Sequence, residues 1–121
     1  MMRLALLAAL AACTSSGHSD LRVRACNGTD KPMTGLVYHD DFAGGSLAPG
    51  ACTEYRGTAR AYRYTYAKFT IGTDQFVIQP IDYVGETELD PDDWSFMITI
   101  VDYANRSANI AARREHARIG S

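Results

Sequence analysis

A cluster of tyrosine and arginine side chains in the middle of the chain is the best candidate for binding chemistry. Its members are Tyr55, Arg60, Tyr62, Arg63, Tyr64 and Tyr66. If residues 62–66 are extended, their three tyrosines share one face, because side chains in a strand repeat every two residues. Tyrosine and arginine are enriched at the energetic centres of binding surfaces, so this face suits a protein or a glycan. Alternatively, the rings cover the core or the sheet edge, with their hydroxyl groups at the rim.

Two acidic segments raise the question of a metal site. His39 is followed by Asp40 and Asp41, and the connection 82–93 concentrates further carboxylates at Glu86, Glu88, Asp90, Asp92 and Asp93. Calcium prefers several oxygen ligands at once, but the spacing is not that of an EF-hand loop, whose glycine and terminal glutamate are missing. Aspartate is also an ordinary turn residue. We therefore expect solvated loops and no metal ligands.

The residues that could perform catalysis form no recognisable set. The segment Gly44-Gly45-Ser46 lacks the flanking pattern of a nucleophile elbow, which also needs a strand-to-helix turn. No pair of carboxylates stands out as a glycosidase pair. The sequence therefore predicts a protein that is not an enzyme and that uses no cofactor.

The first thirteen residues predict where the protein is located. Arg3 precedes an uncharged apolar run at residues 4–12. This run is about half of the roughly 20 residues that span a bilayer, which is typical of a signal peptide. It ends in LAAC (residues 10–13), which resembles the lipobox of bacterial lipoproteins. The resemblance implies cleavage before Cys13 and acylation of that residue. The alternative is an ordinary signal peptide with an accidental cysteine.

The residues after the lipobox refine the expected location. Thr14 follows Cys13, whereas lipoproteins retained in the inner membrane typically carry aspartate there. The resemblance therefore implies the bacterial outer membrane, most simply its periplasmic face. A single acyl chain gives only marginal membrane binding, but lipoproteins carry two or three. The membrane is thus an expected partner through the N-terminal lipid, and residues 13–19 are expected to be a small polar tether.

The chain that follows the signal peptide and the tether has the length of a single domain. Residues 20–116 are the expected domain, and residues 117–121 an expected polar tail. The net charge of −2 becomes −3 when Arg3 is removed with the signal peptide. A nucleic-acid-binding protein would need a clustered basic surface, so we expect no nucleic-acid partner.

The three cysteines are accounted for if Cys13 carries lipid. Cys26 and Cys52 then remain, in a protein exported to an oxidising compartment. Such a pair is most simply a disulfide. A redox or metal role is the alternative, but the chain has no CxxC motif, and two thiols alone do not make a zinc site.

Alternating apolar and polar residues predict strands throughout the domain. They cover residues 21–25, 36–39, 52–56, 65–73, 75–79, 94–103 and 108–114, with a loop around residues 40–45. Residues 94–103 are apolar on both faces, which indicates a central strand covered on two sides. About seven short strands and no helix predict an all-β fold, a single antiparallel β-sandwich of immunoglobulin- or transthyretin-like type. An open barrel is the alternative.

Further segments resemble small proteobacterial lipoproteins. They are SLAPGACTEYR (46–56), AYRYTYA (61–67), QPIDYVGETEL (79–89) and WSFMITIVD (94–102). In such proteins an L-x-x-G-x-Tyr pattern leads into a sandwich strand, whereas Asp92-Asp93-Trp94 replaces the glycine and tyrosine here. The resemblance carries over no catalytic residue.

These expectations describe a lipid-anchored envelope protein. Its non-catalytic β-sandwich would bind or support another envelope component, such as an envelope protein. A periplasmic module that binds a small ligand or calcium, through residues 82–93 or the tyrosine face, is one alternative. An enzyme inhibitor is another.

Overall fold

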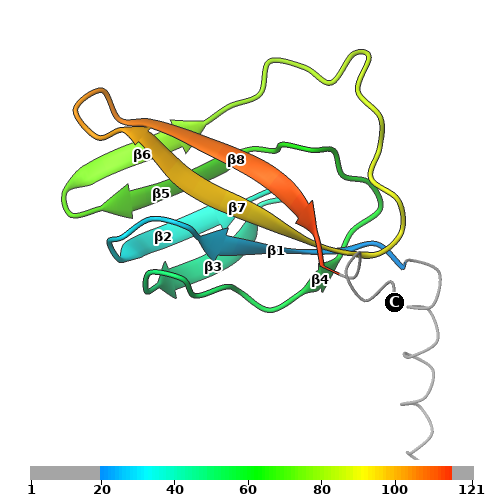
Figure 1. Ribbon diagram of the computed structural model, residues 1–121, viewed down its shortest axis with the longest axis horizontal. Helices are drawn as coiled ribbons and strands as arrows, with labels where there is room; N and C mark the ends of the chain where they lie inside the picture. Colours follow the sequence, from blue (N-terminus) through cyan, green and yellow to red (C-terminus); the bar gives the residue numbers. More distant parts are fainter. Residues whose placement is uncertain (1–19, 116–121) are drawn as a thin grey trace, which may run out of the picture.

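Residues 20–115 form two stacked β-sheets in the computed structural model, which describes this part of the chain (Figure 1). The strands are β1 (Arg22–Asn27), β2 (Met33–Tyr38), β3 (Phe42–Leu47), β4 (Arg56–Gly57), β5 (Ala67–Ile71), β6 (Asp74–Ile78), β7 (Asp93–Asp102) and β8 (Ser107–Arg114). One sheet has the order β4-β1-β7-β8, and the other has the order β3-β2-β5-β6. Paired strands are antiparallel except β1 and β7, which are parallel. The predicted all-β sandwich is confirmed.

The core lies between the sheets and uses the alternation seen in the sequence. In β1 and the residue before it, Leu21, Val23 and Ala25 are buried. In β8, Ile110 is buried, and Ala108 and Ala112 pack against the core, as their spacing predicts. Large side chains fill the centre, because they bury the most apolar surface per residue. They are Tyr38, Phe69, Phe76, Phe96, Met33, Leu36 and Ile98.

The glycine-rich segment after the β2–β3 turn is a strand, whereas a loop was expected there. β3 pairs with β2, and its register shifts on either side of Leu36. Gly44 lies under Leu36, so closely that a Cβ on Gly44 would stand 2.5 Å from the Leu36 Cδ2 atom. Gly45 adopts a φ of 65°, a conformation that glycine accepts without strain. The pairing thus depends on a side chain of the neighbouring strand, which the local pattern does not reveal.

Two other strand predictions are corrected. The expected strand 52–56 is reduced to an isolated bridge between Cys26 and Cys52 and to the two-residue β4. β7 is central, between β1 and β8, but it is not covered on two sides. Phe96 and Ile98 are buried on its inner face, whereas Val101 on the outer face is 67% exposed.

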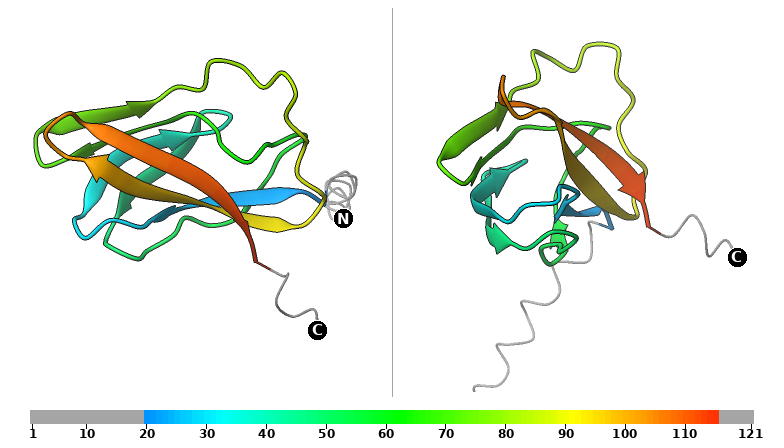
Figure 2. Two further views of the ribbon diagram at one scale, coloured as in Figure 1. Left: turned by 45° about the horizontal axis from the view of Figure 1, so that its top comes forward. Right: turned by 60° about the vertical axis from the view of Figure 1, so that its left-hand side comes forward.

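The register gathers several connections at one end of the sandwich. β1 and β7 both begin there, since Arg22 is paired with Asp93 and also with Gly57. The β2–β3 turn, the segment 58–66 and the loop 79–92 meet at the same end, because Tyr38 is paired with Ala67 and Ala67 with Ile78. Both ends of the described chain lie there as well (Figure 1). We call this the proximal end. The loop 79–92 arches away from the two sheets in all views (Figure 2).

Several predictions concern residues beyond the described range. The signal peptide (1–12), the lipidated Cys13, the tether (13–19) and the polar tail (117–121) all lie outside residues 20–115. Within residues 20–115, no helix is long and apolar enough to cross a membrane.

Candidate functional site

A cavity of about 570 Å³ opens at the proximal end of the sandwich. This volume falls in the range of roughly 300–1,000 Å³ that is typical of small-molecule sites. Three segments that are far apart in the sequence supply its walls: the β2–β3 turn, the segment 58–66 and the loop 79–92. The lining residues are His39, Asp40, Ala59, Arg60, Tyr62, Thr65, Tyr66 and Tyr83.

A buried histidine holds two of these segments together. His39 follows β2, and its side chain is only 8% exposed. Its Nδ1 atom lies 2.9 Å from the Thr65 hydroxyl, and its Nε2 atom lies 3.0 Å from the Thr58 hydroxyl and 3.1 Å from the Arg60 carbonyl oxygen. The His39 amide also donates to the carbonyl oxygen of Tyr66. The imidazole therefore fixes both ends of the segment 58–66 against the β2–β3 turn.

These partners define the tautomer of His39. The Arg60 carbonyl only accepts hydrogen bonds, so Nε2 carries the proton and Nδ1 accepts the Thr65 hydroxyl. The Thr58 hydroxyl donates its proton to the Asp40 carboxylate at 2.9 Å. The Thr58 oxygen can therefore accept a hydrogen bond from Nε2 of His39. Burial lowers the pKa of His39, although Asp40 and the Arg60 carbonyl act in the opposite direction. The ring is neutral at pH 7 and is a structural clamp.

The tyrosines of the cavity form a stacked wall. The ring of Tyr83 lies 4.4 Å from that of Tyr62, and the two planes differ by 12°. Tyr83 also stacks on Tyr64, at 5.6 Å and 23°. The long loop 79–92 thus brings one tyrosine onto two others from the segment 58–66. Stacked rings stabilise each other by about 0.5–1.5 kcal/mol beyond their burial, so they hold this wall in place.

Polar contacts fix the loop that carries Tyr83. The amide of Leu89 donates to the carbonyl oxygen of Ala61, and Arg60 and Glu88 form an exposed ion pair at 3.3 Å. Nearer the sheet, Arg114 Nε donates to the Asp92 carboxylate at 2.8 Å, and the Arg114 guanidinium lies over the Trp94 ring. These contacts hold residues 88–92 of the loop to the segment 58–66 and to β8.

The predicted tyrosine–arginine surface is divided by the structure. Arg60, Tyr62 and Tyr66 line the cavity together. Residues 62–66 lie outside any strand and bend at positions 63 and 64, so the condition of an extended segment is not met. Tyr64 packs against the core, as the alternative interpretation proposed.

The other two members of that surface lie elsewhere. Arg63 lines a smaller cavity of about 230 Å³ beside Trp94. Tyr55 lies under the guanidinium groups of Arg22 and Arg24, which are 5.1 and 4.6 Å from its ring centre. Tyr55 does not line the larger cavity.

The acidic residues form ion pairs with arginines and do not converge. Glu88 is paired with Arg60, Asp90 and Asp92 with Arg114, and Asp93 with Arg22. Among residues 20–115, no three His, Cys, Asp or Glu side chains are grouped so that they could hold a metal ion.

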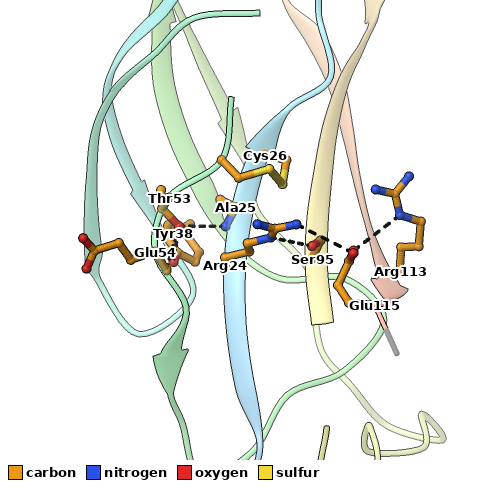
Figure 3. Close-up of a disulfide and its surroundings, with 10 residues drawn as sticks. Arg24, Ala25, Cys26, Tyr38, Thr53, Glu54, Ser95, Arg113 and Glu115 are labelled. Carbon is orange, nitrogen blue, oxygen red and sulfur yellow. Dashed lines mark hydrogen bonds and ion pairs between the residues drawn. A yellow bond between two sulfur atoms is a disulfide. The ribbon is translucent and has the colours of Figure 1, made fainter. Parts of the chain in front are cut away.

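The predicted disulfide between Cys26 and Cys52 is present (Figure 3). It joins β1 to the segment 52–55, and the hydrogen bonds of Thr53 continue this junction. The Thr53 amide donates to the Ala25 carbonyl at 2.8 Å, and the Ala25 amide donates to the Thr53 hydroxyl at 3.1 Å. Cys26 is paired with Met97, in the middle of β7, and neither cysteine lines the cavity.

Sequence reasoning identified Arg60, Tyr62 and Tyr66 and missed the other lining residues, of which Tyr83 and His39 matter most. Tyr83 belongs to a connection that drew attention only for its carboxylates. His39 was considered as a metal ligand, whereas the structure makes it a clamp between threonines. A single tyrosine in a long acidic loop is only a weak sign of a binding site. No local sequence pattern shows which threonines will contact a histidine.

Comparison with protein-family models, with curated proteins and with solved structures gave no match. The geometry of the cavity and the sequence motifs are therefore the basis of a functional assignment.

Proposed function

We propose that this protein is a lipid-anchored component of the bacterial outer membrane that faces the periplasm. Its β-sandwich binds another envelope component through the tyrosine cavity, without catalysis. The observation that supports binding best is the cavity of about 570 Å³ walled by Tyr62, Tyr66 and Tyr83. Concave sites with aromatic walls and a few polar groups are typical of ligand binding.

The state of the polar residues favours binding over catalysis. Both ring nitrogens of His39 are engaged by the protein, and the hydroxyl groups that contact them belong to Thr58 and Thr65, which are 6% and 4% exposed. A general base must reach the proton that it abstracts. His39 has no lone pair directed at a substrate, and Asp40 and Arg60 remain as groups that can orient a ligand.

The lipid anchor is tested by metabolic labelling. Radiolabelled palmitate should enter the wild-type protein and should not enter a Cys13→Ala variant. Equal incorporation into both proteins would contradict the anchor.

The binding site is tested by photo-crosslinking in intact cells. A photoreactive amino acid at Ala59, which is exposed and lines the cavity, should capture one discrete envelope component. Tyr62→Ala should abolish the adduct, and Tyr103→Ala, at the far end of the sandwich, should preserve it. Thermal melting of both variants would show that they are folded.

A second position gives the matched control. Val101 is 67% exposed on the outer face of β7, so a photoreactive group there should not produce the same adduct. Absence of any adduct at Ala59, or the same adduct from Val101, would contradict the proposed function.

A further inference from the structure

We infer that the cavity binds a neutral saccharide, with the apolar face of a sugar ring against the tyrosine wall and its hydroxyl groups on Asp40 and Arg60. This inference rests on the proposed function, because it names the ligand class of the same cavity. Three properties support it: a fixed aromatic wall, polar groups beside that wall, and the distribution of charge around the opening.

The aromatic wall is suited to a sugar ring. Tyr62, Tyr66 and Tyr83 all line the cavity. Stacking on Tyr83 occupies one face of Tyr62 and holds that ring in place, so the opposite face of Tyr62 and the ring of Tyr66, which has no stacking partner among the described residues, remain for a ligand. The face of an aromatic ring is electron-rich, so it attracts the slightly positive C–H bonds on one face of a pyranose. A wall that is held before binding loses little conformational entropy when the ligand arrives.

The polar groups beside the wall match hydroxyl groups. The Asp40 side chain is 63% exposed and uses one oxygen to accept from Thr58. The Arg60 side chain is 65% exposed. A carboxylate accepts hydrogen bonds and a guanidinium donates them, and a sugar hydroxyl can satisfy both.

The charges disfavour an anionic ligand. Among the described residues that line the cavity, Arg60 is the one cationic side chain, and it forms an ion pair with Glu88 at 3.3 Å. Asp40 also lines the cavity. Next to it, burial and the nearby carboxylates of Glu86 and Asp82 raise the pKa of Tyr64, which stacks on Tyr83. A phosphorylated or carboxylated glycan would meet net negative charge here.

The ring geometry disfavours a cationic ligand as well. Quaternary ammonium groups bind in cages, in which several aromatic faces surround the charge. Tyr62 and Tyr83 are parallel within 12° and stack on each other with their ring centres 4.4 Å apart, so no space is left between their faces for a cation. A neutral ring with an apolar face and polar edges fits both the wall and the charges.

The test is isothermal titration of the full-length protein, purified in a detergent without a sugar headgroup. The probes are chitotetraose and cellotetraose as neutral oligosaccharides, tetragalacturonate as an anionic one, and choline as a cation. We expect saturable binding of at least one neutral probe at micromolar to millimolar concentration, and weaker or no binding of the charged probes.

Variants assign the binding to the cavity. Tyr62→Ala should weaken the affinity for the neutral probe about tenfold or more, as expected for an aromatic anchor. Tyr62→Phe, which keeps the ring, should retain most of the affinity even if the alanine variant is poorly folded. Tyr103→Ala is the matched control and should bind normally.

Failure of the inference is distinguishable from failure of the proposed function. If neither neutral probe binds, or if tetragalacturonate or choline binds more tightly, the saccharide assignment is wrong. In that case a Tyr62-dependent adduct at Ala59 in cells would still support the proposed function. Loss of that adduct would overturn both.

Discussion

At the scale of single residues, the β2–β3 turn shows how a strained backbone supports the cavity. His39 and Asp41 adopt φ values of 59° and 63°, a left-handed region that is uncommon for residues other than glycine. The strain persists because His39 is held by Thr58, Thr65 and the Arg60 carbonyl. The same contacts make the clamp sensitive to protonation.

Acidification should destabilise the protein through His39. Its pKa is below the ordinary 6.5 in the folded state, mainly because of burial, so the unfolded chain binds the proton more readily. The free energy of unfolding should therefore fall as the pH is lowered from about 7.5 through 6.5 towards the folded pKa. The pKa of Glu115 is also lowered, mainly by its hydrogen bond to Ser95. The stability that this carboxylate contributes is lost only below about pH 4.5.

Denaturant titrations at a series of pH values would measure this effect. His39→Asn should remove the loss between pH 7.5 and 5.5, since asparagine does not titrate and tolerates a positive φ. His116→Gln keeps His39 and should retain the loss. An unchanged pH profile in His39→Asn would assign the effect to another group.

Gly28 should be intolerant of a side chain. A Cβ at this position would stand 2.8 Å from the backbone carbonyl oxygen of Ile98, the same oxygen that accepts the Gly28 amide. A backbone atom in the central strand β7 cannot move aside, and overpacking of this kind typically costs about 1–3 kcal/mol. Gly28→Ala should lower the free energy of unfolding by that amount in a denaturant titration.

Gly57 provides the matched control. A Cβ there meets nothing within 4 Å, and Gly57 does not have a positive φ. Gly57→Ala should leave stability within about 0.5 kcal/mol of the wild type, as most exposed substitutions do. Equal stability of the two variants would contradict this prediction, because it would show that the backbone of β7 at Ile98 moves to accommodate the added methyl group.

At the scale of elements, the sequence predicts what depends on local alternation. Val23, Phe96 and Ile110 follow the period of two, and all three are buried in the strands where the pattern places them. β3 was missed because its pairing depends on Leu36 of β2 packing over Gly44. The tyrosine face depended on an extended segment 62–66, but this segment bends at positions 63 and 64. His39 holds Thr58 and the Arg60 carbonyl before the bend and Thr65 after it, which the local pattern does not reveal.

The cavity was only partly predictable for the same reason. Arg60, Tyr62 and Tyr66 were identified because they are close in sequence. Tyr83 completes the wall from a loop about twenty residues further along, and stacking on Tyr62 brings it there. Long connections take their positions from tertiary contacts, which sequence spacing does not encode.

Arg114 should determine how firmly that loop is held. Its guanidinium binds the Asp92 carboxylate at 2.8 Å, lies 3.6 Å from Asp90 and covers the Trp94 ring. Arg114→Ala should increase hydrogen exchange of the amides at residues 82–92 and weaken ligand binding, because Tyr83 is then less well placed. The global free energy of unfolding should change by about 1 kcal/mol or less, because the ion pairs are partly exposed.

The neighbouring residue is the control for this prediction. Arg113 is 63% exposed and is paired with Glu115 at 3.6 Å, without a contact to the loop that the structure records. Arg113→Ala should leave exchange in the loop unchanged. Equal protection of the loop in both variants would contradict the role of Arg114.

At the scale of the whole molecule, the cavity and the first described residue share the proximal end. Asp20 precedes β1 there, and the β2–β3 turn, the segment 58–66 and the loop 79–92 meet at the same end. If Cys13 carries lipid, seven residues (13–19) separate the bilayer from the domain, and they span at most about 25 Å. The turn between β7 and β8 lies at the far end of the ten-residue β7, which is about 33 Å long. The proposed anchor would therefore hold the cavity close to the membrane surface.

Energy transfer to the membrane tests this orientation. Ala59 at the cavity and Ala104 in the β7–β8 turn are both exposed, and a cysteine at either position would be the single free thiol, because Cys26 and Cys52 are bonded and Cys13 would carry lipid. In vesicles with a headgroup-labelled acceptor lipid, a fluorophore at residue 59 should transfer energy more efficiently than one at residue 104. Tumbling of the domain about its proximal end would reduce this difference but would not reverse it. Equal transfer would mean that the anchor gives the domain no preferred orientation, and greater transfer from residue 104 would mean that the cavity faces away from the membrane, towards a component deeper in the periplasm. Either result would contradict the prediction.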